Sequence, residues 1–172
     1  MFPFSLCLRG FALAVFFSLG LGCRPAFLII PSYIKTVGVA PTENKTSWFG
    51  LDIAMTQNLI QQFQLDGRVG IEDPDRSDMV VKVIIKKYSE TPQSQDPKTN
   101  AVLQYLITLD YDVVALDHVE NKTLSEYPGL QDSVYYYTTY NTGAIPQTRD
   151  QALQQLEQDM ARLIVLRVMQ GN

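Results

Sequence analysis

The chain has 172 residues, of which 46% are hydrophobic and 19% charged, so it can form one domain with a core and is not a disordered tail. Its net charge is −4, and its charged residues are scattered, with no basic run longer than Lys86-Lys87, so we do not expect nucleic acid as a partner. Both cysteines, Cys7 and Cys23, lie near the start and the one histidine is His118, so we expect no metal site, no cofactor and no histidine-dependent catalysis.

Residues 1–22 have the order of a secretory signal, with the charge of Arg9 followed by an apolar run. The run ends directly before Cys23 in the pattern of a bacterial lipoprotein signal, so we expect Cys23 to be the lipidated first residue. Two alternatives are an ordinary signal peptide with a chance cysteine, and a transmembrane anchor that continues to Ile30. Arg24 and Pro25 interrupt the longer span, which makes an anchor costly.

If Cys23 is acylated, the chain binds the membrane through its N-terminal acyl chains. Residues 23–32 then form the lipidated N-terminus and a linker, and residues 33–172 form a single periplasm-facing α+β domain. Because Arg24 is not the acidic residue that retains bacterial lipoproteins in the inner membrane, we expect delivery to the outer membrane.

The first predicted elements are a strand over residues 33–40 and a polar loop over residues 42–47. Residues 48–65 predict an amphipathic helix that ends at Gly67, because apolar residues recur every four positions. A short strand follows over residues 68–71. The apolar face of the helix consists of Leu51, Met55, Leu59 and Phe63.

The middle of the chain predicts a β-meander. An acidic turn over residues 72–78 precedes a strand over residues 79–88, and a loop over residues 89–100 leads to a long alternating strand over residues 103–115. One face of the first of these strands consists of Met79, Val81, Val83 and Ile85.

The end of the chain predicts the return of the meander and a second helix. Residues 117–122 form a turn, and return strands are expected over residues 123–127 and 133–140, on either side of Pro128-Gly129. A capping-box pattern from Thr148 to Gln151 opens an amphipathic helix that extends to Val168.

These elements predict an α+β two-layer sandwich, in which two helices pack on one face of a mixed sheet of about four or five strands. The other sheet face mixes aliphatic, aromatic and cationic side chains. It can serve as a contact surface, or it can be an ordinary half-buried face with amphipathic lysines. This face is expected to hold Val80, Lys82, Ile84, Lys86, Tyr88, Leu106, Thr108, Asp110 and Val114.

Catalytic motifs are missing from the sequence. It contains neither a convincing Ser/His/Asp set nor a glycine-rich phosphate loop. Asp110 and Asp112 share a strand face and could raise each other's pKa, but solvated alternation explains them better. Residues 72–78 lack the spacing and the glycine of an EF-hand, so we expect a plain turn. We therefore expect that the protein is not an enzyme.

Several segments together resemble the lipopolysaccharide-assembly lipoprotein family LptE. They are Cys23, the strand and Asn-Lys-Thr loop of residues 34–46, the helix from Leu51, residues 63–68, residues 77–85 and the C-terminal helix. The resemblance implies a non-catalytic outer-membrane lipoprotein that sits as a plug inside the lipopolysaccharide-inserting β-barrel, LptD. It also implies that the chain helps this barrel to fold and binds lipopolysaccharide during transport.

Lipopolysaccharide offers phosphates and acyl chains, which favour cationic and apolar side chains. The best local cluster is Lys82, Lys86 and Lys87, although strand alternation places Lys87 on the opposite face. Alternatively, these lysines only increase solubility.

Large amphipathic side chains are suited to a protein interface. The residues expected at the barrel interface are Tyr88, Tyr135, Tyr136, Tyr137 and Tyr140, and packing in the core is the alternative for those that face inward.

Two other functions stay open. The chain could be an outer-membrane lipoprotein adaptor that activates a peptidoglycan synthase, since such domains also combine an early strand, an Asn-x-Thr loop and an amphipathic helix. An envelope hydrolase that uses Asp110 and Asp112 is the third possibility.

Overall fold

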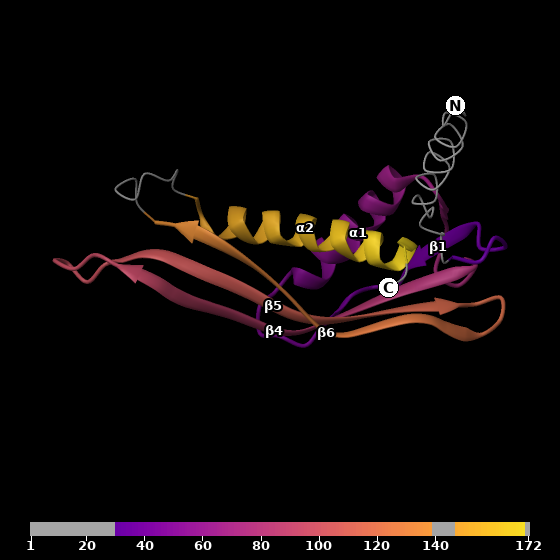
Figure 1. Cartoon of the computed structure of the whole chain (residues 1–172), viewed down its shortest axis with the longest axis horizontal. Coiled ribbons are helices and arrows are strands. Elements are labelled where there is room, and N and C mark those ends of the chain that lie inside the picture. Colours follow the sequence, from indigo (N-terminus) through magenta and orange to yellow (C-terminus); the bar gives the residue numbers. More distant parts are fainter. Residues whose placement is uncertain (1–29, 139–146, 171–172) are drawn as a thin grey trace, which may run out of the picture.

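The computed structural model describes residues 30–138 and 147–170, and in these the two helices lie on the same side of one sheet (Figure 1). The α+β two-layer sandwich is therefore confirmed. The elements in chain order are β1 (Thr36–Val39), β2 (Glu43–Asn44), α1 (Leu51–Asp66), β3 (Gly70–Ile71), β4 (Met79–Gln95), β5 (Val102–Asp117), β6 (Lys122–Tyr137) and α2 (Arg149–Gln170).

The sheet is mixed, as expected. Its strand order is β3-β1-β4-β5-β6, and β2 also pairs with β4. Pairing is parallel between β1 and β3 and between β4 and its partners β1 and β2, whereas β4, β5 and β6 form an antiparallel meander. The two-residue strand β2 lies in the segment that was expected to be a loop. Its backbone completes the ladder on β4 beyond the end of β1.

The core lies between the sheet and the two helices. Alternate residues of β4 and β5 face the helices, which bury one face each, so the periodicities in the sequence correctly identify the core positions. Fully buried large side chains include Leu51, Met55, Leu59, Phe63, Met79, Ile85, Ile107, Leu109, Tyr111, Met160 and Ile164.

Local signals in the sequence also position the helix ends. Gly67 adopts φ 68° after α1 and donates its N–H to the Phe63 carbonyl at 3.1 Å, as a helix C-cap does. At the start of α2, the Gln151 N–H donates to Thr148 Oγ1 at 3.2 Å and the Thr148 N–H donates to Gln151 Oε1 at 3.0 Å. The capping box is thus confirmed.

Strand β4 extends to Gln95, through part of the segment predicted to be a loop. Beyond Ile85, β5 is its only partner strand among the described residues, so the missing N–H of Pro92 breaks no ladder on the other edge of β4. The hairpin of β4 and β5 consequently projects past the helix layer at the end of the molecule opposite β1 (Figure 1).

Strand β6 is also longer than predicted, because it continues through Pro128-Gly129, where two separate strands were expected. Gly129 adopts φ 66°, and the register with β5 shifts between the Tyr111 and Val113 pairs. An irregularity within the strand therefore replaces the expected break.

A register shift between Ile85 and Lys87 changes which residues of β4 face the helices. Before it, Val81, Val83 and Ile85 are buried; after it, Tyr88 packs against the core and Lys87 pairs with Asp110 on the opposite face. The expected placements of Tyr88 and Lys87 are therefore wrong, because strict alternation does not allow for an inserted residue.

Within residues 30–138 and 147–170, neither helix combines the length and apolarity that a membrane-spanning helix requires.

Candidate functional site

The helix-free face of the sheet, called the open face here, carries the three lysines singled out from the sequence. Lys82 lies opposite Val114 on β5, and Lys87 lies opposite Asp110. Lys86 forms an ion pair with Asp112, with 2.8 Å between Lys86 Nζ and Asp112 Oδ2. Of the ion pairs in the described part of the chain, none includes Lys82 or Lys87. All three ammonium groups are thus placed on one face, two of them without a carboxylate partner.

Two aspartates lie among these lysines. Asp112 accepts the Gly129 N–H at 2.7 Å, and this bond, together with Lys86, lowers the pKa of Asp112. Asp110 accepts a hydrogen bond from Gln131 Nε2 at 2.8 Å. A carboxyl group that donates a proton near neutral pH needs a raised pKa, so Asp112 is set up for structural pairing rather than for acid catalysis.

The tyrosines expected at a partner interface are divided between the two faces. Tyr135 lies opposite Leu106 on the open face and is 50% exposed. Tyr137 follows the same alternation and is half-buried, whereas Tyr136 is buried and stacks on Tyr105 with ring centroids 5.2 Å apart. Cys23 and Tyr140 lie outside the described residues.

Tyr88 belongs to an aromatic cluster on the helix side of the sheet. Its ring stacks on Trp48 with centroids 4.8 Å apart, and the Arg149 guanidinium lies 4.5 Å from the centroid of the Trp48 ring. Stacking and the cation–π contact link the loop before α1, strand β4 and the start of α2. Tyr88 is thus used inside the molecule, which makes it a poor candidate for a partner surface.

Glu90 provides the polar centre of the same cluster. Its carboxylate accepts hydrogen bonds from the Tyr136 hydroxyl and, at 3.1 Å, from the Tyr88 hydroxyl. Arg149 Nη1 lies 3.5 Å from Glu90 Oε2. These contacts connect the projecting hairpin to β6 and α2.

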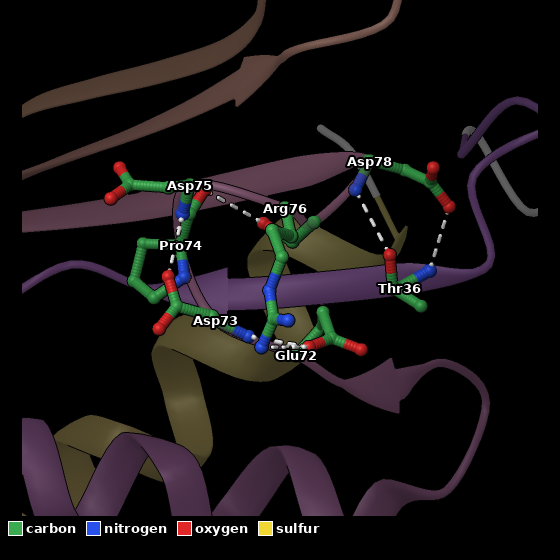
Figure 2. A network of polar contacts seen from close by, with 8 residues as sticks. Thr36, Glu72, Asp73, Pro74, Asp75, Arg76 and Asp78 are labelled. Carbon is green, nitrogen blue, oxygen red and sulfur yellow. Dashed lines mark hydrogen bonds and ion pairs between the residues drawn. The ribbon is translucent and has the colours of Figure 1, made fainter.

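The acidic turn after β3 is ordered by its own side chains (Figure 2). Asp73 Oδ1 accepts the Asp75 N–H at 3.0 Å, and the Asp73 carbonyl accepts the N–H groups of Arg76 and Ser77. Glu72 forms an ion pair with Arg76 at 3.1 Å. No cluster of metal-ligating side chains occurs in the part of the chain that the structure describes.

At the end of this turn, Asp78 holds the start of β1. Asp78 Oδ2 accepts the Lys35 N–H at 2.7 Å. It also accepts the Thr36 N–H at 3.0 Å, and the Asp78 N–H donates to Thr36 Oγ1 at 2.9 Å (Figure 2). The Lys35 N–H is the main cause of a lowered pKa of Asp78. The Asp78 carboxylate thus fastens the start of β4 to the start of β1.

The Asn-Lys-Thr segment builds the loop before α1. Asn44 Oδ1 accepts the Thr46 N–H at 3.0 Å, Thr46 Oγ1 accepts the Trp48 N–H at 3.1 Å, and Asn44 Nδ2 donates to the Trp48 carbonyl at 2.6 Å. These bonds fix the Trp48 backbone, and the next residue, Phe49, directly precedes the N-cap Gly50 of α1. Phe49 is 96% exposed.

Phe49 begins a row of outward-facing residues along α1. Ile53 is 62% exposed and Leu65 is 71% exposed, and both are separated from Phe49 by multiples of four residues. Each four-residue step turns about 40° around a helix, so the row winds around α1 and Ile53 and Leu65 point about 120° apart. We call the row the α1 ridge; it consists of Phe49, Ile53, Gln57, Gln61 and Leu65.

The apolar periodicity of residues 48–65 indicates the buried face of the helix and gives no sign of this exposed row. The available signal was an absence of charge: between Asp52 and Asp66 the helix has no charged residue. Charged residues are depleted at the centres of protein interfaces.

Comparison with known families assigns the chain to a family. The family model of LptE, described as lipopolysaccharide-assembly, matches residues 34–168, a range that includes β1 and most of α2. The chain belongs to the LptE family. Membership makes it a lipopolysaccharide-assembly lipoprotein of the cell envelope, in agreement with the resemblance noted in its sequence. No curated protein matches it.

Solved structures share the fold of this LptE-family chain. Protein XCC0632 from Xanthomonas campestris is 10% identical with a TM-score of 0.54, and the match covers 86% of this chain and 90% of that one. The hypothetical protein CT253 from Chlamydia trachomatis is 13% identical with a TM-score of 0.52, covering 79% and 96%. PelC from Paraburkholderia phytofirmans, a dodecamer, is 7% identical with a TM-score of 0.51, covering 84% and 92%. At these identities the likeness concerns the fold alone.

Proposed function

We propose that this protein is a non-catalytic outer-membrane lipoprotein that forms a complex with an LptD-like β-barrel. In this complex it acts as plug and assembly partner while lipopolysaccharide is delivered to the outer leaflet. The observation that carries the proposal is the LptE family match across residues 34–168. The open face and the α1 ridge add support, because both sides of the thin domain offer surface for contacts.

Purification of the full-length, C-terminally tagged protein from its native envelope in mild detergent tests the complex. We expect a large outer-membrane barrel to co-purify in stoichiometric amount, identified by mass spectrometry. Co-purification of a peptidoglycan synthase would instead support the adaptor function, and the absence of a stable partner would contradict the plug.

Lipopolysaccharide binding is the second element of the proposal, and we assign it to Lys82, Lys86 and Lys87 on the open face. Phosphate groups would pair with Lys82 and Lys87, which have no carboxylate partner among the described residues, while Ile84 and Val114 offer apolar surface to an acyl chain. Lys86 contributes less, since Asp112 already neutralises it.

The corresponding variant is Lys82→Glu with Lys87→Glu, which leaves the Lys86–Asp112 pair intact. We expect lipopolysaccharide affinity, measured with the full chain by surface plasmon resonance, to fall about tenfold or more because attraction becomes repulsion. Lys98→Glu, in the turn of the projecting hairpin, is the matched control. Equal affinity of both variants and the wild type would exclude this site.

For the barrel interface, we retain Tyr135 and Tyr137 on the open face as candidates. Tyr140, which lies outside the described residues, stays a candidate from the sequence alone. Tyr88 and Tyr136 are engaged within the domain. Replacing Tyr135 by Ser should reduce barrel recovery in the same purification without a change in melting temperature. Unchanged recovery would remove Tyr135 from the interface.

Anchoring through acylated Cys23 completes the proposal. Replacing Cys23 by Ser should release the protein from the outer-membrane fraction and abolish labelling by an alkyne-tagged palmitate. A Cys23→Ser variant that stays in this fraction and is still labelled would contradict anchoring at this residue.

A further inference from the structure

The end of the domain where the folded chain begins is built on one buried carboxylate, that of Asp117 at the end of β5. Asp117 is only 1% exposed, and its Oδ2 accepts the Tyr33 hydroxyl at 2.5 Å. Its Oδ1 accepts the N–H groups of Val119 at 2.8 Å and Glu120 at 3.0 Å, in the turn between β5 and β6. Asp117 therefore joins the beginning of the domain to the β5–β6 turn.

A second carboxylate strengthens the same end of the domain. The His118 N–H of the β5–β6 turn donates to the Asp78 carbonyl at 2.8 Å. The Asp78 carboxylate in turn accepts the N–H groups of Lys35 and Thr36 at the start of β1. Residues 33–36 and 117–122 thus form one hydrogen-bonded unit, called the tether end here.

The tether end exposes apolar and cationic side chains to solvent. Val119 is 60% exposed although its backbone is fixed, and Tyr33 is 37% exposed. Lys35 and Lys122 are also exposed, and Lys122 forms an ion pair with Glu120. Exposed apolar side chains next to a tyrosine and lysines are typical of protein segments that lie at the boundary between phospholipid head groups and acyl chains.

The length of chain before the domain keeps the tether end close to a membrane. In the proposed function the acyl chains on Cys23 lie in the bilayer, and seven residue steps separate Cys23 from Ile30. Seven steps span at most about 25 Å. The opposite tip of the domain, at Lys98 between β4 and β5, lies about 50 Å from Asp117 along β5 (Figure 1). The tether therefore confines one end of the domain to the lipid surface and leaves the other free of it.

Confinement by the tether makes a weak contact sufficient. A short tether holds the domain at an effective concentration of about the millimolar range, so a contact too weak to bind the free domain still determines how the anchored domain is oriented. One valine and one tyrosine bury little apolar area, which suits such a role. The tether also favours lipid over a protein partner, because the anchor itself brings the lipid surface.

We propose that the tether end docks on the phospholipid head groups of the leaflet that holds the acyl chains, with Val119 inserted between the head groups, Tyr33 beside it and Lys35 supplying charge to the phosphates. The inference rests on the acylation of Cys23 in the proposed function and specifies how the anchored domain is oriented. Two points then hold the domain, the acyl chains and the tether end, and the β4–β5 hairpin points away from this lipid surface.

Lipid-borne quenchers test this orientation in the full-length acylated protein, reconstituted in vesicles of phosphatidylethanolamine and phosphatidylglycerol. A thiol-reactive fluorophore is attached at Glu120→Cys, beside Val119, or at Lys98→Cys in the opposite tip, and the lipids carry a nitroxide on the head group. An acylated Cys23 cannot take the label, and Cys7 lies in the predicted signal. We expect quenching at residue 120 to be about threefold stronger than at residue 98, because residue 98 lies about 50 Å farther along the sheet.

The variant Val119→Asp distinguishes docking from proximity that the tether alone would cause. Quenching at residue 120 should fall by about half or more in this variant, because anionic lipids repel a carboxylate and the head groups no longer gain an apolar side chain. The matched control is Ala101→Asp, an apolar-to-acidic change at an exposed position of the opposite tip, which should leave the quenching unchanged.

The outcomes separate this inference from the proposed function. Equal quenching at the two labelled positions would overturn the docked orientation, and so would wild-type quenching in Val119→Asp. In both cases the acylation of Cys23 and co-purification of the barrel are unaffected, so the proposed function stands. If the protein does not stay on the vesicles, anchoring at Cys23 fails together with the inference. Quenching at residue 120 that appears only after the barrel is added would assign this end to the barrel and overturn the assignment to lipid.

Discussion

Gly38 on β1 lies so close to Pro74 in the acidic turn that a Cβ atom at residue 38 would stand 2.5 Å from the Pro74 Cα. It would also lie 2.6 Å from Ser77 Oγ, which donates a hydrogen bond to the Met79 carbonyl at the start of β4. Because the Pro74 Cα is a backbone atom, it cannot yield by rotation of a side chain. The turn therefore requires a residue without a side chain at position 38.

We expect Gly38→Ala to lower the free energy of unfolding by about 1–3 kcal/mol, because the turn must move away from the sheet. Urea denaturation followed by circular dichroism measures this change. Gly70→Ala is the control, since the nearest atom to its added Cβ is the Lys35 carbonyl oxygen at 3.8 Å. Equal stability of the two variants would contradict the close approach at Gly38.

The cluster around Glu90 gives a second prediction. Replacing Glu90 by Gln removes the carboxylate that accepts from two tyrosine hydroxyls and faces Arg149, so we expect a loss of about 1–3 kcal/mol in the free energy of unfolding. Glu43→Gln breaks only an exposed pair with Lys45 and should have almost no effect. A stability change no larger than that of the control would show that the cluster does not hold the hairpin.

Glu157 on α2 is only 5% exposed, and burial raises its pKa from 4.5 to about 7. The folded protein therefore binds a proton that the unfolded chain releases between pH 4.5 and 7, so stability should fall as the pH rises through this window. Glu157→Gln should remove this dependence and gain on the order of 2 kcal/mol at pH 8.

Melting curves from pH 5 to 8 test this prediction. Asp159→Asn, at an exposed position of the same helix, should leave the pH dependence unchanged. If the melting temperature of Glu157→Gln changes with pH as that of the wild type does, the buried carboxyl is not the source of the pH dependence.

Asp78 should make stability depend on pH in the opposite direction to Glu157. Its pKa is lowered by the Lys35 N–H, so the stability that it contributes is present at neutral pH and is lost as the pH falls through the pKa of the folded state. Asp78→Asn should have a lower melting temperature than the wild type at pH 7. In acid, where the wild-type carboxylate is protonated, the difference between the two melting temperatures should become smaller. Asp75→Asn is the control in the same turn. If the melting temperatures of Asp78→Asn and the wild type differ by the same amount at every pH, the carboxylate bonds to β1 are not the source of the effect.

The sequence predicted most of the fold because its signals are local. Four-residue spacing from Leu51 to Phe63, Gly67 after the helix and the Thr148–Gln151 box each depend on neighbours along the chain. The lengths of β4 and β6 could not be predicted in this way. Whether Pro92 or Pro128 ends a strand depends on which edge of the strand is unpaired, and this is a property of the assembled sheet.

The candidate surfaces were predictable only in part. The lysines of the open face were identified, but Lys87 was assigned to the wrong face and Tyr88 to the wrong environment because a bulge has no signature in the alternation. The Trp48–Tyr88–Arg149 contacts join residues far apart in the chain, so no spacing rule could have predicted them.

The irregularity between Ile85 and Lys87 reverses which residue numbers of β4, odd or even, face the helices. Upstream of it, the odd-numbered residues from Met79 to Ile85 face the helices; directly downstream, the even-numbered residues Tyr88 and Glu90 do. Deleting Lys86 would restore regular alternation from Ile85 to Lys87 and leave Tyr88 and Glu90 on the helix side. The bulge thus adds a third lysine to the open face without moving the aromatic cluster, so an aligned homologue that lacks this residue should lose the Lys86–Asp112 ion pair and keep the cluster.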